Sequence, residues 1–257
     1  MDNANSSLNV EGKVVLITGA SRGLGKAVAM GFAKAGAKLS LAARNEELLN
    51  EVAAEAKEFG AEALTVKCDV GVESDLVALV EKTVERFGRI DVLVNNAGIS
   101  PWVSRSHEVT TDMWKDLLQI NVVGCFILSR EVGKVMLGQG GGSIINMASL
   151  GGMLGMPGQV AYSATKGALI QMTKTLAVEW ARKNITVNAL APTFLATDLT
   201  ADLISSDKHS KPLLARIPMG KFGVADDVVG AALFLASDSA SYVTGTVIPI
   251  DGGTLAC

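Results

Sequence analysis

The sequence has few of the residues that build disulfide scaffolds or metal centres. It contains three cysteines and two histidines among 257 residues. The cysteines, at Cys68, Cys125 and Cys257, show neither a paired spacing nor the short spacing of metal ligands. With only His107 and His209 available, a histidine-rich metal site is not expected either. These absences predict no bound metal and a protein of a reducing compartment.

Long apolar runs and basic clusters are missing as well. No stretch reaches the roughly 18 uninterrupted apolar residues that a membrane span requires. The first residues, MDNANSSLNVEGK, lack the basic start and apolar core of a signal peptide. Net charge is −3, with 23 Lys and Arg against 26 Asp and Glu, and no basic block is present to bind a phosphate backbone. We expect a cytoplasmic protein that binds neither a membrane nor nucleic acid.

The sequence does contain a regular alternation of short apolar runs and longer amphipathic segments. Glycines end several of the amphipathic segments, as they commonly end helices. The short runs are continuously apolar, which is typical of parallel strands covered on both faces. This alternation predicts an α/β fold: a doubly wound, Rossmann-type parallel sheet of seven strands with helices on both faces. Predicted strands span 13–17, 38–42, 63–67, 91–94, 143–147, 185–190 and 246–250, and predicted helices span 25–35, 45–59, 73–87, 110–137, 159–182 and 225–236.

The organisation along the chain predicts one domain over residues 1–257. Hydrophobic residues make up 49% of the sequence, and no linker-like or low-complexity tract interrupts it. The main irregular stretch follows the sixth predicted strand, at the sheet edge where such folds bind ligands. We interpret the segment near 193–223 as a substrate lid.

A glycine-rich turn joins the first predicted strand to the first predicted helix. Glycines let the backbone turn sharply and approach a pyrophosphate, while amides at the helix N-terminus point toward it. The spacing Gly-x-x-x-Gly-x-Gly differs from the commoner fingerprint, and a glycine-rich turn alone is often structural. Its place after the first strand of a βα series favours dinucleotide binding. The expected contacts are Gly19, Ser21, Arg22, Gly23, Leu24 and Gly25.

The end of the second predicted strand indicates which dinucleotide is bound. A site for NAD places Asp or Glu about 20 residues past the glycines, where it would repel a 2′-phosphate. No acid ends this strand, and Arg44 and Arg22 each offer a planar guanidinium to a phosphate. Alternatively, both arginines are solvated, and Glu46 or Glu47 pairs with Arg44. We favour NADP(H) as the cofactor.

Tyr162 and Lys166 stand four residues apart, thirteen residues after Ser149 ends an apolar run. In a helix, residues i and i+4 share a face, so the phenol and the ammonium project into one site. A free tyrosine has a pKa of about 10 and transfers protons poorly at pH 7, and a cation one turn away favours its phenolate. Taken alone, this spacing is a common accident on an exposed helix, but the motifs around it favour a catalytic pair.

Together these motifs resemble the short-chain dehydrogenase/reductase family, in its compact one-domain branch. The matches run in order from Thr18 to the C-terminus and so cover essentially the whole chain. They are the glycine turn, Cys68-Asp69-Val70, Asn95-Asn96-Ala97-Gly98, Asn121, Ser149, Tyr162 with Lys166, and Pro249-Ile250-Asp251-Gly252-Gly253.

The resemblance implies a role for each of four catalytic residues. Tyr162 would give a proton to a carbonyl during reduction and take one during alcohol oxidation. Lys166 would hold the nicotinamide ribose and stabilise the phenolate. Ser149 would hydrogen-bond the substrate oxygen. Asn121 would support a water on the proton path, although alone it reads as a structural asparagine.

The resemblance also implies further cofactor contacts. Asp69 suits the adenine amino group, although it can equally be the acid that starts the next helix. One departure from the family is Thr193, where the family usually carries glycine after Pro192, so the nicotinamide loop or the pocket can differ here. The implied contacts are Asp69, Val70, Asn96, Ala97, Gly98, Pro192, Leu195 and Thr197, together with Tyr162 and Lys166.

The substrate itself is left open by the sequence. We expect a moderately apolar pocket in which Trp102, Met153 and Phe194 join Ser149 and Tyr162. We predict reduction of a small or medium ketone, as by a carbonyl reductase; the alternatives are a 3-oxoacyl-carrier-protein reductase and a sugar-acid or polyol dehydrogenase. A non-catalytic protein that senses NADP is a rival from another class. The family also implies a homotetramer formed through the two long helices and the last strand.

Overall fold

Seven parallel strands form the central sheet of the computed structural model, which describes residues 8–101, 103–196 and 207–257. The strand order is β3-β2-β1-β4-β5-β6-β9, and each neighbouring pair is parallel. The predicted seven-stranded, Rossmann-type fold is therefore confirmed. The strands are β1 (Val14–Thr18), β2 (Lys38–Ala43), β3 (Ala63–Lys67), β4 (Val92–Asn95), β5 (Gly142–Met147), β6 (Ile185–Pro192) and β9 (Val247–Ile250).

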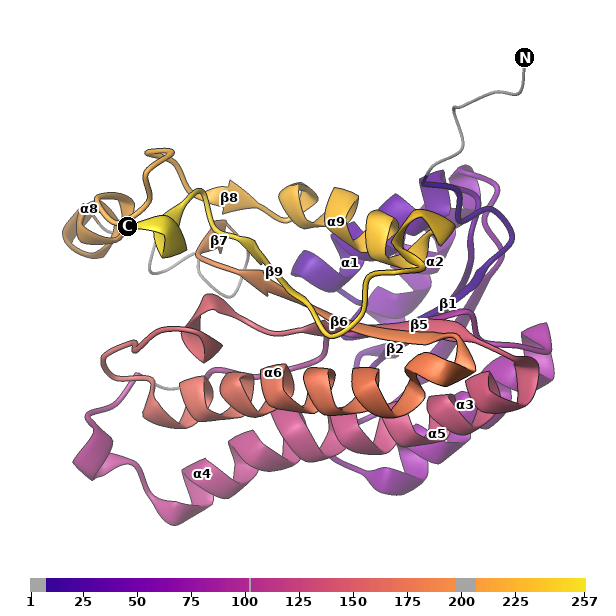
Figure 1. Cartoon of the computed structure of the whole chain (residues 1–257), viewed down its shortest axis with the longest axis horizontal. Coiled ribbons are helices and arrows are strands. Elements are labelled where there is room, and N and C mark those ends of the chain that lie inside the picture. Colours follow the sequence, from indigo (N-terminus) through magenta and orange to yellow (C-terminus); the bar gives the residue numbers. More distant parts are fainter. Residues whose placement is uncertain (1–7, 102, 197–206) are drawn as a thin grey trace.

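Helices cover both faces of this sheet (Figure 1). One layer contains α1 (Gly23–Lys34), α2 (Glu46–Glu58) and α9 (Asp226–Ala236), and the other contains α3 (Glu73–Phe87), α5 (Gly124–Gln139) and α6 (Val160–Trp180). In the described parts of the chain, no helix combines the length and apolar character of a membrane span. Further helical segments are α4 (Thr111–Leu118), the π-helical segment Gln119–Val123, α8 (Asp207–Leu214) and short 3-10 turns at Ser106–Glu108, Leu150–Gly152, Ala181–Lys183, Asp238–Ala240 and Thr254–Ala256.

Two apolar cores, one on each face, explain why the strands are apolar without alternation. Val15 and Ile17 pack in the core that contains residues of α1, α2 and α9. Leu16, which lies between them, points to the opposite core with residues of α3, α5 and α6. Successive side chains of a strand face opposite sides, so a sheet buried on both faces requires apolar residues at every position.

The strand order reverses direction between β1 and β4, which places their carboxyl ends side by side. Ile17 of β1 pairs with Val94 of β4 in the register. The glycine turn leaves β1 and the segment from Asn95 to Gly98 leaves β4 at this same edge. Such a switch point is where doubly wound sheets bind ligands.

The prediction of one long helix over 110–137 is wrong in one respect. The chain is helical throughout, but α4 and α5 are separated by a π-helical segment, Gln119–Val123. The physical reason is a switch from i→i+4 to i→i+5 hydrogen bonding, which leaves the apolar pattern almost unchanged. The segment near 193–223, expected to be irregular, contains β7 (Leu195–Ala196), α8 and β8 (Gly223–Val224); residues 197–206 of that expected lid lie outside the described part.

The three cysteines are all free thiols. Cys68 and Cys125 are buried, while Cys257 is exposed. Burial, together with the nearby carboxylates of Asp75 and Asp69, raises the pKa of Cys68 to about 12. Burial likewise raises the pKa of Cys125 to about 11, against the opposing effect of the Lys166 cation. Both buried thiols are therefore protonated near neutral pH and behave as core side chains.

Candidate active site

The glycine turn after β1 is packed so closely that it requires glycine. A Cβ on Gly25 would overlap the carbonyl oxygen of Gly19 and lie 2.8 Å from its carbonyl carbon. Gly19 has a φ of +65°, and a Cβ there would lie 3.0 Å from the Cα of Ala97. The turn and the segment after β4 therefore touch backbone to backbone, as a site for a closely approaching ligand requires.

Asn96 holds this turn in place through its side chain. Its Nδ2 donates to the carbonyl oxygens of Thr18 at 2.9 Å and Gly19 at 3.3 Å. The backbone N–H groups of Asn96 and Ala97 both donate to Thr18 Oγ1, at 3.1 and 3.0 Å. Asn96 thus fixes the backbone of the glycine turn at the predicted cofactor site. Thr18, whose hydroxyl joins the two segments, was not among the predicted site residues.

The N-terminus of α1 is left open for an anion. Its N-cap residue, Arg22, makes no side-chain capping hydrogen bond, and no acid lies in the first turn. By contrast, Asn45 caps α2, and Glu46 and Glu47 occupy the first turn of that helix. Free amides and the positive end of the helix dipole make such a terminus suitable for a pyrophosphate. Gly23, Leu24 and Ser21 surround it, partly buried.

Arg22 and Arg44 are both exposed beside this turn, and neither forms an ion pair with any described residue. The alternative pairing of Arg44 with Glu46 or Glu47 is therefore not seen. Beyond the end of the neighbouring strand β3, Asp69 Oδ1 accepts a hydrogen bond of 2.9 Å from the backbone N–H of Gly71. The partly buried Val70 follows it.

Tyr162 and Lys166 lie on one face of α6, as predicted from their spacing. The Lys166 Nζ is 5.6 Å from the centre of the Tyr162 ring. Lys166 is only 5% exposed, and its Nζ donates to the Met147 carbonyl oxygen at 2.7 Å. An ammonium has three N–H groups, and no carboxylate within the described chain pairs with this one. A buried, unpaired cation stabilises a neighbouring phenolate and has donors left for ribose hydroxyls.

Ser149 enters the same site from the end of β5. It is the N-cap of the 3-10 turn Leu150–Gly152, and its Oγ accepts a hydrogen bond of 3.1 Å from the Gly151 N–H. This turn packs directly on α6, because a Cβ on Gly152 would lie 2.6 Å from the carbonyl carbon of Lys166. The close packing fixes Ser149 relative to the helix that carries the tyrosine and the lysine.

Asn121 lies in the π-helical segment and is completely buried. Its Oδ1 accepts from the Ile99 N–H at 2.8 Å, and its Nδ2 donates to the Ile99 carbonyl at 2.9 Å and to Thr165 Oγ1 at 3.3 Å. Thr165 Oγ1 in turn donates to the Tyr162 carbonyl at 2.7 Å. Both Nδ2 hydrogens therefore have partners, so a water held by Asn121 would have to donate to one of its oxygens.

A buried polar chain ties the catalytic helix to the sheet. Asn95 Nδ2 donates to Asn146 Oδ1 at 2.9 Å and to Ser129 Oγ at 2.9 Å. Asn146 Nδ2 donates to Thr173 Oγ1 on α6 at 2.9 Å. These side chains join β4, β5, α5 and α6 without contact with solvent. Sequence reasoning missed Asn146 and Thr173, although an asparagine inside an otherwise apolar strand was a visible signal.

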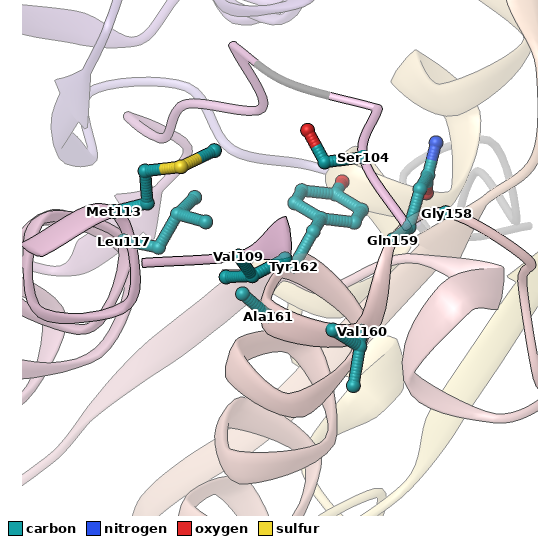
Figure 2. Close-up of a pocket in the computed structure, with 9 residues that line it drawn as sticks. All are labelled: Ser104, Val109, Met113, Leu117, Gly158, Gln159, Val160, Ala161 and Tyr162. Carbon is teal, nitrogen blue, oxygen red and sulfur yellow. The ribbon is translucent and has the colours of Figure 1, made fainter. Parts of the chain in front are cut away.

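The expected substrate residues lie in different surroundings. Met153 is exposed and Phe194 is partly buried, whereas Trp102 and the cofactor candidate Thr197 lie outside the described residues. Beside Tyr162 there is a hollow of about 10 Å³, roughly the room that one water needs (Figure 2). It is lined by Ser104, Val109, Met113, Leu117, Gly158, Gln159, Val160, Ala161 and Tyr162.

The departure at Thr193 leaves the backbone path of the sheet intact. Pro192 ends β6 in register with Ile250 of β9, and the Thr193 N–H donates to the Ile250 carbonyl at 3.1 Å. The Thr193 hydroxyl is buried and has no hydrogen-bond partner among the described residues. With Leu195 it lines a pocket of about 360 Å³ between the ends of β6 and β9 and the β7–β8 ribbon. The Thr193 side chain, which a glycine at this position would lack, thus occupies space beside the predicted nicotinamide contacts.

Comparisons with known proteins agree with this geometry. A family model described as enoyl-(acyl carrier protein) reductase matches residues 19–254. A 3-oxoacyl-[acyl-carrier-protein] reductase of Synechocystis is 41% identical over 94% of this chain and 96% of its own. A 2-dehydro-3-deoxy-D-gluconate 5-dehydrogenase of Pseudoalteromonas atlantica is 41% identical over 95% of this chain and 96% of its own. The structure of a gluconate 5-dehydrogenase from Burkholderia cenocepacia, in complex with NADP and tartrate, superposes with a TM-score of 0.95 at 35% identity, covering 99% of this chain and 100% of the other.

Proposed function

Because the chain belongs to the short-chain dehydrogenase/reductase family, we propose that it interconverts a ketone and a secondary alcohol with NADP(H). The observation that carries the proposal is the buried Lys166 ammonium beside Tyr162, which pairs with no carboxylate of the described residues. Ser149 is held against the same helix. A non-catalytic NADP sensor is the weaker reading, since such a protein has no use for this arrangement. It would show NADPH binding with no turnover of any carbonyl compound.

Each catalytic side chain has one task in this proposal. Tyr162 gives its proton to the carbonyl oxygen during reduction and takes one from the alcohol during oxidation. Lys166 stabilises the phenolate that is left, because its charge is poorly screened at 5% exposure. Ser149 donates a hydrogen bond to the oxygen where negative charge develops. Asn121 holds the Ile99 segment and Thr165 in position and offers an oxygen to a water on the proton path.

The described residues fit a bound dinucleotide. The open N-terminus of α1 and the backbone contact of Gly19 with Ala97 suit a pyrophosphate. Lys166 retains donors for a ribose, and Asp69, which follows β3, suits the adenine amino group. When bound, NADP(H) supplies or accepts the hydride. Gly98 lies close to Lys166 and Asn121. A Cβ at this position would lie 3.7 Å from Lys166 Nζ and 3.1 Å from Asn121 Oδ1, so a side chain there would be crowded.

The preference for NADP(H) depends on Arg44. We expect Arg44→Ala to weaken NADPH binding about 10- to 100-fold, the range for a lost hydrogen bond to a charged group. NADH binding should stay unchanged, because NADH lacks the 2′-phosphate. Nicotinamide fluorescence titrations measure both constants. Lys57→Ala is the matched control, since it removes an equal charge from an exposed position at the end of α2; an equal loss of affinity for both cofactors in Arg44→Ala would contradict the assignment.

For the substrate, we propose a small or medium ketone. The relatives named above act on acyl-carrier-protein thioesters and on sugar acids, and these two classes remain the alternatives. NADPH oxidation measured with a keto sugar acid, a 3-oxoacyl thioester and a simple cyclic ketone tests the proposal. Consumption of NADPH with at least one of them is expected, and consumption with none would refute it.

We also propose a cytoplasmic homotetramer built from this single domain. Exposed apolar side chains on the outer helices support association, namely Phe126 and Leu137 on α5 and Val178 on α6. In addition, β9 is an edge strand with β6 as its one neighbour in the described sheet, and edge strands invite pairing. Light scattering of the purified protein should give about four times the 26.7 kDa chain mass; a monomer at micromolar concentration would contradict the assembly.

A further inference from the structure

Gln159 stands at the entrance of the catalytic helix without an evident structural task. It is the N-cap residue of α6, three positions before Tyr162, yet its side chain makes no capping hydrogen bond. The Gln159 side-chain amide also forms no hydrogen bond with any other residue of the described chain, although Gln159 is partly buried. Gln and Asn side chains carry two donors and an acceptor. The only buried side-chain N and O atoms without a partner in the described chain are Ser163 Oγ and Thr193 Oγ1. The Gln159 amide therefore reaches solvent, and its donors and acceptor are available to a bound molecule.

Ser104 is the second unpartnered polar group at this place. Its backbone N–H donates to the Gly158 carbonyl at 3.0 Å, so the segment before α4 is fixed against the entry of α6. The contact is tight, because a Cβ on Gly158 would lie 2.8 Å from Cγ1 of Val103. Within the described residues, the Ser104 hydroxyl has no hydrogen-bond partner. It is therefore held close to Gln159 by the backbone and not by its own side chain.

Both groups flank the catalytic phenol. Figure 2 shows the Ser104 hydroxyl and the Gln159 amide on the same side as the Tyr162 hydroxyl, one to either side of it. The opposite wall of the hollow is apolar, with Val109, Met113 and Leu117. A carbonyl that accepts the Tyr162 proton would consequently have a polar protein group on either side of it.

We propose that Gln159, assisted by Ser104, positions the substrate by hydrogen-bonding a hydroxyl group next to the reacting carbonyl. The substrate class is then a polyhydroxylated ketone of the sugar-acid type. A hydroxyl both donates and accepts, and so satisfies an amide and a serine together, whereas an alkyl chain would leave both without partners. Sites built to bind a substrate hydroxyl strongly reject analogues that lack it. This inference rests on the proposed function and narrows its substrate.

The test uses two ketones that differ only in hydroxyl groups. Both 5-dehydro-D-gluconate and 5-oxohexanoate have six carbons, a terminal carboxylate and a ketone at C5. We expect the wild-type enzyme to favour the first at least about 100-fold in kcat/KM. Gln159→Leu should lower kcat/KM for 5-dehydro-D-gluconate about 10- to 30-fold, mainly through KM, and leave 5-oxohexanoate within about 2-fold. Ser104→Ala should act in the same direction with a smaller effect.

Controls separate this role from a structural one. Gln171→Leu makes the same chemical change at an exposed position of α6 and should alter neither substrate. The NADPH dissociation constant of Gln159→Leu, from fluorescence titration, should equal that of the wild type. Equal losses for both ketones in Gln159→Leu would overturn the inference.

The inference and the proposed function can fail separately. If the wild type reduces a 3-oxoacyl thioester but not 5-dehydro-D-gluconate, the proposed reaction stands and the polyhydroxylated substrate is wrong. If none of the ketones leads to consumption of NADPH, the proposed function is wrong, and this inference is wrong as well.

Discussion

Replacing Tyr162 by phenylalanine is expected to lower kcat about 1,000-fold, within the range of 10²–10⁴ for a lost general acid–base group. The substitution removes only the hydroxyl, so the packing of α6 and the Lys166 contact with Met147 should persist. NADPH affinity should therefore stay close to the wild-type value. Steady-state turnover with the best ketone, together with fluorescence titration of NADPH, measures both effects.

The chain offers a matched control for this prediction. It contains two tyrosines, and the other, Tyr242, is fully exposed. Tyr242→Phe should leave kcat and NADPH affinity unchanged. A Tyr162→Phe enzyme with wild-type kcat would show that another group transfers the proton, and the role given to Lys166 would then be wrong as well.

Adding one methyl group at Gly25 is expected to abolish tight cofactor binding. The new Cβ of Gly25→Ala would overlap the Gly19 carbonyl oxygen and would come within 2.5 Å of Asn96 Nδ2. Gly19 belongs to the turn and Asn96 holds that turn in place from the segment after β4, so the turn has to open. We expect a loss of about 1–3 kcal/mol in the free energy of unfolding, as for other overpacked sites. NADPH affinity should fall more than about 100-fold, because the anion-binding backbone moves.

Gly230→Ala is the matched control, since it places the same methyl group inside α9 where a Cβ meets nothing within 4 Å. It should raise the free energy of unfolding by about 0.5–1 kcal/mol, because alanine favours a helix interior. Urea unfolding followed by circular dichroism compares the two variants. If Gly25→Ala unfolds and binds NADPH like the wild type, the turn is not the cofactor site.

Local sequence patterns predicted the framework of this fold well. The strands around Val15, Leu39 and Ile144 stand out because burial on both faces demands continuous apolar residues. The amphipathic helices α2 and α3 carry acids in their first turn, which marks where each begins. The first helix begins at Gly23, two residues before the predicted start, because glycine in a turn gives no propensity signal for a helix.

Contacts between residues distant in sequence could not be predicted from local sequence patterns. In the π-helical segment, Asn121 bonds Ile99 and Thr165, which are distant in sequence. The role of Asn96 in holding the turn became visible only once β1 and β4 were adjacent. Tyr162, Lys166 and Ser149 could be named in advance because their spacing reflects one helix and one strand end. Gln159 had no such pattern, since an unsatisfied side chain can be recognised only from its surroundings.

The most direct test of the central claim follows the hydride itself. NADPH that carries deuterium at both C4 positions of the nicotinamide is incubated with the protein and 5-dehydro-D-gluconate, a 3-oxoacyl thioester or cyclohexanone. The products are analysed by mass spectrometry. Our account predicts an alcohol with one deuterium on its carbinol carbon for each NADPH consumed, and almost no labelled product with Tyr162→Phe. Tight NADPH binding without labelled alcohol from any of the three ketones would contradict it and leave the chain as a binding protein.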